Sequence, residues 1–166
     1  MRTGLWKLLV GSVFGTLILS AGCAFPQEPA NFAIWGGFFK PFTEHLNGDW
    51  IVGADWRHSE RFYLGLRYFR SKDSDTHVSG KGLALLVGLT FPFDKGSFER
   101  EGVIYRIGAG AGLNRLEVSG KGRTYRGMVE VFMEAITKRN LSVRLSGLVG
   151  GLDGNNGWSV ALGLQF

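Results

Sequence analysis

The feature that most constrains the fold is an alternation of apolar residues with small, polar or charged ones that recurs along most of the chain. It occurs in short runs separated by stretches rich in glycine, serine, asparagine and charged residues. A period of two places alternate side chains on opposite faces of a β-strand, so each run predicts one strand. The eight runs are residues 31–39, 50–58, 61–69, 82–93, 102–114, 125–135, 141–149 and 158–166.

One face of every predicted strand is apolar, and the charged residues fall on the other face. The third run, for example, sets Phe62 and Leu64 against Arg67. An even number of short alternating strands predicts an all-β, antiparallel, up-and-down barrel. The alternation alone leaves two arrangements open, because the apolar face points inward in a soluble barrel and outward in a membrane barrel.

Two features favour the membrane arrangement. The face that carries the charges consists mostly of glycine, alanine and serine with a few arginines and carboxylates, which suits a narrow, filled lumen better than a soluble exterior. Aromatic residues on the apolar face gather at the strand ends, as they do at the two interfaces of a bilayer. One predicted girdle comprises Trp56, Phe62, Phe91, Tyr105 and Phe166, and the other comprises Trp50, Tyr68, Tyr125 and Trp158.

The last strand adds a third feature, because its alternation runs to Phe166. A terminal aromatic residue that closes an alternating strand resembles the assembly signal of bacterial outer-membrane barrels. Residues 30–166 as a whole resemble the small eight-stranded family of the outer membrane protein A transmembrane domain and the opacity proteins. The resemblance implies an eight-stranded transmembrane β-barrel, monomeric, in contact with outer-membrane lipid and lipopolysaccharide. It also implies insertion by the outer-membrane assembly machinery, with four outward loops and three inward turns.

The N-terminus carries a segment of a different kind. Arg2 and Lys7 precede an apolar run at residues 8–19, which is too short to span a bilayer as a helix, and small residues follow. This pattern predicts a cleavable signal peptide over residues 1–24. The rest of the chain, residues 25–166, is then one barrel domain.

A single cysteine, Cys23, lies near the end of the predicted signal peptide, so the chain contains no internal disulfide. Residues 19–23 resemble a bacterial lipoprotein signal, in which the cysteine becomes the lipid-bearing first residue. Ser20 departs from that pattern, which usually has leucine there. The alternative is an ordinary cleavage site ending near Ala24, and either interpretation exports the protein.

The sequence VSGKG occurs twice, at residues 78–82 and 118–122. Counted from a periplasmic N-terminus, both copies fall in outward loops one strand pair apart, where glycine allows positive φ and lysine is solvated. Neither copy matches the GxxxxGK[ST] motif of phosphate-binding loops, which argues against a nucleotide site. Lys81, Lys121 and Arg123 are candidate contacts for lipopolysaccharide phosphates, and simple solvation of these side chains is the alternative.

The interior of an eight-stranded barrel is only wide enough for its own side chains, so charges on the lumen face have to neutralise one another. The predicted network comprises Asp55, Arg57, Arg67, Arg106, Arg126, Glu130, Glu134 and Arg144. We expect these groups to form a plug. A gated ion path is the alternative.

Turn lengths predict some of the pairs. A three-residue turn at 138–140 sets Glu134 opposite Arg144 on the lumen face. Strand adjacency brings Glu130 toward Arg106. In the same way, a three-residue turn at 58–60 sets Trp56 opposite Phe62, with both side chains on lipid.

Candidate catalytic and metal-binding groups are few. Asp73, Asp75 and His77 alternate in one loop, but a fourth ligand is missing. The segment 151–157, GLDGNNG, lacks the closing glutamate of a calcium loop, and its Asn-Gly pair is typical of a turn. His45, His58 and His77 fall in different connections. We therefore expect no metal and no cofactor.

These observations predict a non-catalytic bacterial outer-membrane protein with a surface or envelope-stabilising role. The formal charge of +5 at pH 7 is too small an excess to indicate binding to nucleic acid. One alternative is an outer-membrane enzyme acting on lipid A. We find no serine that pairs with a histidine and an acid at one rim of the predicted barrel, so the lipid A deacylases, small barrels with a His-x-Ser pair, are matched in architecture only. A second alternative is a soluble periplasmic barrel that binds an apolar ligand.

Overall fold

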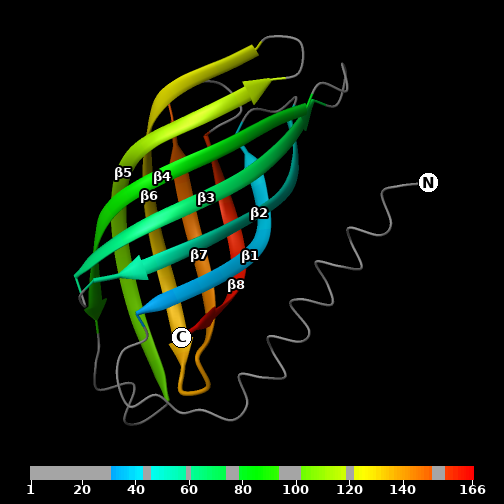
Figure 1. The fold of residues 1–166 in the computed structure, drawn as a ribbon. Helices are drawn as coiled ribbons and strands as arrows, with labels where there is room; N and C mark the ends of the chain where they lie inside the picture. The colour runs from blue at the N-terminus through cyan, green and yellow to red at the C-terminus, as the bar shows by residue number, and fades with distance from the viewer. Residues whose placement is uncertain are drawn as a thin grey trace.

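The computed structural model describes residues 31–42, 46–58, 61–73, 79–93, 102–118, 122–150 and 156–166. The predicted signal peptide and Cys23 lie outside these residues. The described chain forms eight strands (Figure 1). They are β1 (Phe32–Pro41), β2 (Leu46–Arg57), β3 (Phe62–Asp73), β4 (Ser79–Phe93), β5 (Val103–Val118), β6 (Gly122–Thr137), β7 (Leu141–Val149) and β8 (Gly157–Gln165).

The strands close into one antiparallel barrel in which each strand pairs with its neighbours in sequence. The barrel is closed by β1 and β8, whose register runs from Ala33 opposite Gln165 to Pro41 opposite Gly157. Just beyond this pairing, Phe166 N–H donates to Phe32 O at 2.7 Å, and Phe32 N–H donates to Phe166 O at 3.0 Å. The prediction of an eight-stranded up-and-down barrel is confirmed. Closure leaves no open sheet edge along the middle of the molecule.

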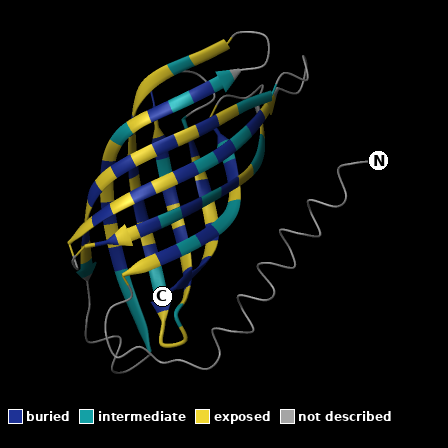
Figure 2. Cartoon of the chain, viewed as in Figure 1, coloured by how far each residue is buried: buried dark blue, intermediate teal, exposed yellow. Residues whose placement is uncertain are grey.

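The predicted faces are also confirmed, because exposed and buried residues alternate along the strands (Figure 2). The exposed set is apolar through the middle of the barrel, with Leu66, Leu85, Val131 and Val160 as examples. Asp55, Arg67, Glu130 and Arg144 point inward and are almost completely buried. An oily exterior around a charged interior is the arrangement of a membrane barrel and the inverse of a soluble one. The alternative of a soluble barrel with a pocket for an apolar ligand is therefore wrong.

Two glycines show how so narrow an interior accommodates large rings. A Cβ atom on Gly53 would overlap the buried indole ring of Trp35, its partner across the β1–β2 pair. A Cβ atom on Gly110 would overlap the hydroxyl end of Tyr63. Absent side chains on one strand thus make room for aromatic ones on another, which explains part of the chain's high glycine content.

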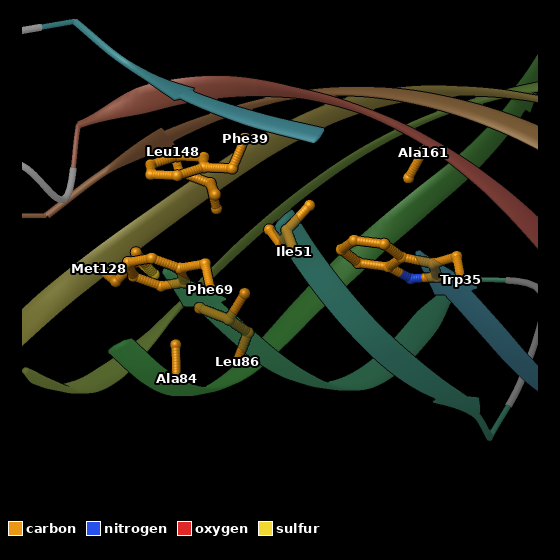
Figure 3. Packing of buried hydrophobic residues seen from close by; sticks show 9 residues of the cluster. All are labelled: Trp35, Phe39, Ile51, Phe69, Ala84, Leu86, Met128, Leu148 and Ala161. Carbon is orange, nitrogen blue, oxygen red and sulfur yellow. The ribbon is translucent and has the colours of Figure 1, made fainter. Parts of the chain in front are cut away.

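The outer half of the lumen holds an apolar cluster beside a few buried polar side chains such as Asn114 and Ser159, and the sequence pattern did not predict this cluster. Figure 3 shows the cluster, whose members come from seven of the strands. They are Trp35, Phe39, Ile51, Phe69, Ala84, Leu86, Met128, Leu148 and Ala161. The rings of Phe39 and Phe69 lie 5.1 Å apart between their centroids. The charged groups occupy the inner half, toward the end that holds both Phe32 and Phe166.

The strands differ in length, and most of those from β2 to β6 extend farther than their sequence patterns predict. The long β4, β5 and β6 have 15, 16 and 16 residues, whereas β7 and β8 have 9 each. In Figure 1 the tips of β5 and β6 rise beyond the ends of β7 and β8 at the end of the barrel opposite the C-terminus. This end carries the predicted outward connections.

The longer strands correct one prediction. In the first VSGKG copy, residues 79–82 lie in β4 and pair with β3, rather than in a loop. Gly82 is needed there for close packing, because a Cβ atom would overlap the Phe69 ring. Only Gly122, in the second copy, has positive φ among the described glycines of the repeat, at 83°. Lys121 lies outside the described residues.

The predicted register of the β2–β3 hairpin is wrong by two residues. Trp56 lies opposite Leu64, not Phe62, because the hairpin closes where His58 N–H donates to Phe62 O at 3.2 Å. A shift of two preserves the faces, so Trp56 and Phe62 both remain on the exterior.

Among the described residues, no helix is long and apolar enough to cross a membrane.

Candidate functional site

The centre of the interior charge cluster is Arg67 on β3, which is fully buried. Its Nη1 lies 2.6 Å from Oδ1 of Asp55, and its Nη2 lies 2.6 Å from Oε2 of Glu130. Its Nε donates to both oxygens of Glu130, each at 3.1 Å. The guanidinium therefore joins carboxylates on β2 and β6, on opposite sides of the barrel. Short, charge-assisted bonds of this kind are the strong ones.

Arg144 on β7 extends the cluster. Its Nη2 lies 2.6 Å from Oδ2 of Asp55, so one carboxylate binds two guanidinium groups. Its Nε lies 3.7 Å from Oε1 of Glu134, the residue directly opposite in the β6–β7 register. The turn geometry read from the sequence predicts this opposition, and the register confirms it.

Aromatic rings separate the charged layer from the apolar one. The Arg67 and Arg144 guanidinium carbons lie 4.6 and 4.9 Å from the centroid of the Trp35 ring. Arg144 also lies 3.9 Å from the Phe132 ring centroid. Cation–π contacts of this kind strengthen where water is excluded. Trp35 thus marks the boundary between the two layers of the lumen.

The inner end of the lumen is organised by Gln165, the last residue of β8. Its Nε2 donates to Oε1 of Glu134 and to Oγ of Ser142, each at 3.1 Å. Its Oε1 accepts a hydrogen bond from Arg57, whose Nη2 also lies 2.8 Å from Oε2 of Glu134. One amide therefore links β2, β6, β7 and β8. Sequence reasoning missed Gln165, although its position in the alternation places it on the lumen face.

Six of the eight predicted lumen charges come together directly in this cluster. They are Asp55, Arg57, Arg67, Glu130, Glu134 and Arg144. The predicted approach of Glu130 to Arg106 is wrong: Glu130 lies opposite Gly110 and binds Arg67, while Arg106 is buried opposite Glu134. Contacts inside a narrow barrel cross the lumen, so strand adjacency did not identify the partner.

Arg126 is the one predicted lumen charge that is not enclosed. It lies opposite Asn114 on the outer part of β6, but it is exposed because β6 there extends past the last pair with β7. Asn114 is fully buried, and no hydrogen-bond partner is found for either end of its amide. The lumen network therefore ends below this level.

A second group of charges lies on the exterior, above the outer aromatic girdle. The register aligns Arg70 with Lys81, Lys81 with Glu117, and Glu117 with Arg123 across β3, β4, β5 and β6. We call these four residues, together with Arg115, the outer charge row. Glu117 Oε2 lies 3.5 Å from Arg115 Nη2 and 3.6 Å from Arg123 Nε. Four cations and one carboxylate thus form one band.

The aromatic girdle lies directly beneath this row. The Trp50 and Tyr68 rings are 5.2 Å apart between centroids, and those of Phe38 and Trp158 are 6.1 Å apart. Tyr125 on β6 is two-thirds exposed and lies opposite Arg115, the member of the outer charge row that lies at the level of the girdle. Aromatic rings at this level, with cations above them, are typical of the interface between acyl chains and headgroups.

Candidate catalytic and metal sites gain no support from the described residues. No group of three or more His, Cys, Asp or Glu side chains there is arranged to hold a metal. The predicted ligands Asp75 and His77, His45 and most of residues 151–157 lie outside the described part of the chain. His58 lies within the described residues, and its ring is 5.8 Å from that of Trp56 between centroids.

The closed barrel, the oily exterior, the girdles and the neutralised interior together define the class of an eight-stranded transmembrane β-barrel. Comparison with solved structures places this fold among the small outer-membrane barrels. Neisserial surface protein A is similar over 84% of this chain and 100% of its own, with a TM-score of 0.51 and 14% identity. The resemblance read from the sequence is thereby confirmed at the level of the fold.

Two other outer-membrane barrels align less closely. The N-terminal β-barrel domain of Pseudomonas aeruginosa OprF is 15% identical, with a TM-score of 0.49, over 82% of this chain and 96% of its own. The attachment invasion locus protein of Yersinia pestis is 12% identical, with a TM-score of 0.46, over 84% of this chain and 100% of its own. No protein-family model and no curated protein sequence matches the chain.

Proposed function

We propose that the protein is a non-catalytic barrel of the bacterial outer membrane that stabilises the envelope surface by binding lipopolysaccharide phosphates through its outer charge row. The observation that carries the proposal is the alignment of Arg70, Lys81 and Arg123 around Glu117, on the lipid-facing side and above the aromatic girdle. Outer-leaflet phosphates lie at this height, and cations there attract them.

The charge balance of the row supports an anionic ligand. Arg70 is also 3.7 Å from Asp49, so some of its charge is already compensated. Lys81 lies opposite Glu117 in the register, and Glu117 lies near two further cations. Two carboxylates, Glu117 of the row and Asp49 beside it, face four cations, which leaves a positive excess that a phosphate group would neutralise. Lys121, next in sequence to Gly122, is proposed as a further contact.

The interior supports a structural role. Among the described residues, the inner half of the lumen holds the ion-paired cluster and the outer half holds packed apolar side chains. In a barrel whose interior is only wide enough for its own side chains, this occupancy favours a structural role. Export by the segment 1–24 and recognition of Phe166 by the assembly machinery remain parts of the proposal. For Cys23, lipidation and removal at an ordinary cleavage site near Ala24 stay the two alternatives.

The test compares lipopolysaccharide binding by the purified protein in detergent with that of the double variant Lys81→Gln, Arg123→Gln. At about 1 kcal/mol per cation near an anionic surface, we expect roughly 30-fold weaker binding for the double variant. The matched control is Arg139→Gln, which removes an exposed cation at the inner turn and should leave binding unchanged. Equal affinities for the wild type and the double variant would contradict the proposal.

A further inference from the structure

Two buried groups at the boundary between the charged and the apolar layers of the lumen keep hydrogen-bond donors that no described group accepts. These donors are Nε1 of the Trp35 indole and Nε and Nη1 of Arg144. Trp35 is completely enclosed and Arg144 is 1% exposed, so both lie in the interior of the barrel. Nearly all buried donors in folded proteins have a partner, and we therefore expect an acceptor at this place.

Arg144 is less completely bonded than Arg67, the other guanidinium group that contacts Trp35. All three nitrogens of Arg67 donate hydrogen bonds to carboxylates. Of the nitrogens of Arg144, only Nη2 donates one, to Asp55, a carboxylate that Arg67 also binds. Its Nε is 3.7 Å from Glu134, which is too far for a hydrogen bond. The carboxylates of the network thus leave two nitrogens of Arg144 without an acceptor.

The two groups lie against each other on either side of β8. The guanidinium carbon of Arg144 is 4.9 Å from the centroid of the Trp35 ring. Trp35 on β1 lies opposite Gly163, and Arg144 on β7 lies opposite Ala161. Figure 3 shows Trp35 and Ala161 at the same end of the apolar cluster. The strand between the two groups therefore offers small residues and no side-chain acceptor.

The charge around Trp35 favours a negatively charged ligand. The guanidinium carbons of Arg67 and Arg144 lie 4.6 and 4.9 Å from its ring centroid, and the carboxylate that both bind is Asp55. The six charges of the network balance, and Arg106 adds a fourth buried arginine to three buried carboxylates in the described lumen. An excess of buried positive charge is costly, and a bound anion offsets it.

The donors also restrict the chemistry of the ligand. Indole and guanidinium groups donate hydrogen bonds and cannot accept them, so the ligand has to be an acceptor. The hydroxyl pair of Ser146 and Ser159, next outward on β7 and β8, uses one of its two protons and leaves the other as a further donor. A water molecule brings donors of its own, whereas a halide only accepts. Larger anions do not suit a densely packed interior.

We propose that the lumen binds a single halide ion, chloride under ordinary conditions, between Nε1 of Trp35 and Nη1 of Arg144. The ion completes the hydrogen bonding of both groups and links β1 to β7 across the small residues of β8. It binds the folded barrel only, because the unfolded chain does not bring the two donors together, and so it stabilises the fold. The site is independent of the outer charge row and of the proposed function.

The first experiment locates the ion. The full barrel is refolded from urea and crystallised in sodium bromide, so that bromide can enter before the lumen closes. Anomalous diffraction is then recorded at the bromine absorption edge. We expect an anomalous peak within hydrogen-bonding distance of Trp35 Nε1 and Arg144 Nη1. A lumen without a bromide peak there, including one in which a water molecule takes the position, would overturn the proposal.

The second experiment measures chloride binding in solution. The unfolding temperatures of the wild type, Trp35→Phe and the control Trp56→Phe are followed on gels of unboiled protein, with gluconate replaced by chloride at constant ionic strength. Binding to the folded state raises this temperature by an amount that depends on the ratio of chloride to its dissociation constant. We expect Trp35→Phe, which keeps a ring but loses the N–H, to bind chloride about tenfold more weakly than the other two proteins.

The control separates this site from anion binding elsewhere. Trp56 lies on the exterior, and all three proteins keep the outer charge row, so nonspecific effects of chloride are the same in each. Equal chloride dependence of Trp35→Phe and Trp56→Phe would contradict the site. A wild type that unfolds at the same temperature in chloride and in gluconate would contradict it as well. If Trp35→Phe fails to fold, the bromide peak in the wild type decides the question.

Discussion

Arg67 and Glu130 are bound to each other across the width of the lumen, with Nη2 2.6 Å from Oε2 and Nε 3.1 Å from both carboxylate oxygens. Both side chains are fully buried. Their strands, β3 and β6, are not neighbours in the barrel. The pair thus links two strands that share no backbone hydrogen bonds.

Removing one member of this pair should be strongly destabilising. We expect Glu130→Gln to lower the free energy of unfolding by about 3–5 kcal/mol, because Arg67 would lose its main counter-charge in a place that water does not reach. Urea unfolding in lipid vesicles, followed by the shift in gel mobility, measures the effect. The control Glu117→Gln, in the exposed outer charge row, should cost no more than about 1 kcal/mol. Similar losses for the two variants would contradict the role assigned to burial.

The small residue at Gly53 should be irreplaceable, because Trp35 fills the space in front of it. We expect Gly53→Ala to cost about 1–3 kcal/mol through overpacking of a rigid indole. Gly127→Ala is the control, since an added Cβ there would have no neighbour within 4 Å. That change should be neutral or stabilise by up to about 1 kcal/mol, since alanine restricts the unfolded chain. The argument fails if the two alanine variants unfold at the same denaturant concentration.

The buried amide of Gln165 should contribute more to stability than its place near the end of the last strand suggests from sequence. We expect Gln165→Leu to lower the temperature at which the unboiled barrel unfolds on a gel. The substitution leaves groups of Arg57, Glu134 and Ser142 without a partner, at about 1–3 kcal/mol for each group that stays unsatisfied. Ser159→Ala, also on β8, removes a single bond to Ser146 and should shift that temperature less. An equal shift would show that Gln165 does not organise the inner end.

The filled lumen should not conduct ions. Its inner half is closed by paired charges, and its outer half by apolar side chains that exclude water. We expect planar bilayers containing the purified protein to show no stable single-channel steps. Glu130→Gln serves as a comparison, since it disrupts the charged layer and leaves the apolar layer in place. Stable steps in the wild-type recordings would refute the plug.

The fold could be predicted from the sequence because period-two alternation specifies the two faces of each strand directly. The opposition of Glu134 and Arg144 was equally accessible, since it depends only on a short turn. The β2–β3 register was missed because the hairpin closes at His58 and Phe62, and a shift of two leaves the face pattern unchanged. A pattern of faces cannot reveal such a shift.

Contacts across the lumen could not be predicted in the same way. Glu130 binds Arg67 rather than a residue on a neighbouring strand. The spacing of residues along the sequence does not show which non-neighbouring strands face each other across the lumen. The ends of the long strands were also missed. Residues 79–82 pair regularly with β3 at the outer end of the apolar run. Backbone hydrogen bonding between strands can continue into water beyond the last apolar residues of the exterior. The outer charge row depends on these strand extensions, because their register places Arg70, Lys81, Glu117 and Arg123 side by side.

The position of Trp35 gives the molecule a built-in optical reporter. Trp50, Trp56 and Trp158 are each about half exposed on the lipid-facing exterior, whereas Trp35 is completely enclosed between Arg67 and Arg144. Brominated acyl chains would quench the emission of the three outward indoles and spare the enclosed one. The unquenched fluorescence of Trp35 would then report when the barrel closes during insertion into the bilayer.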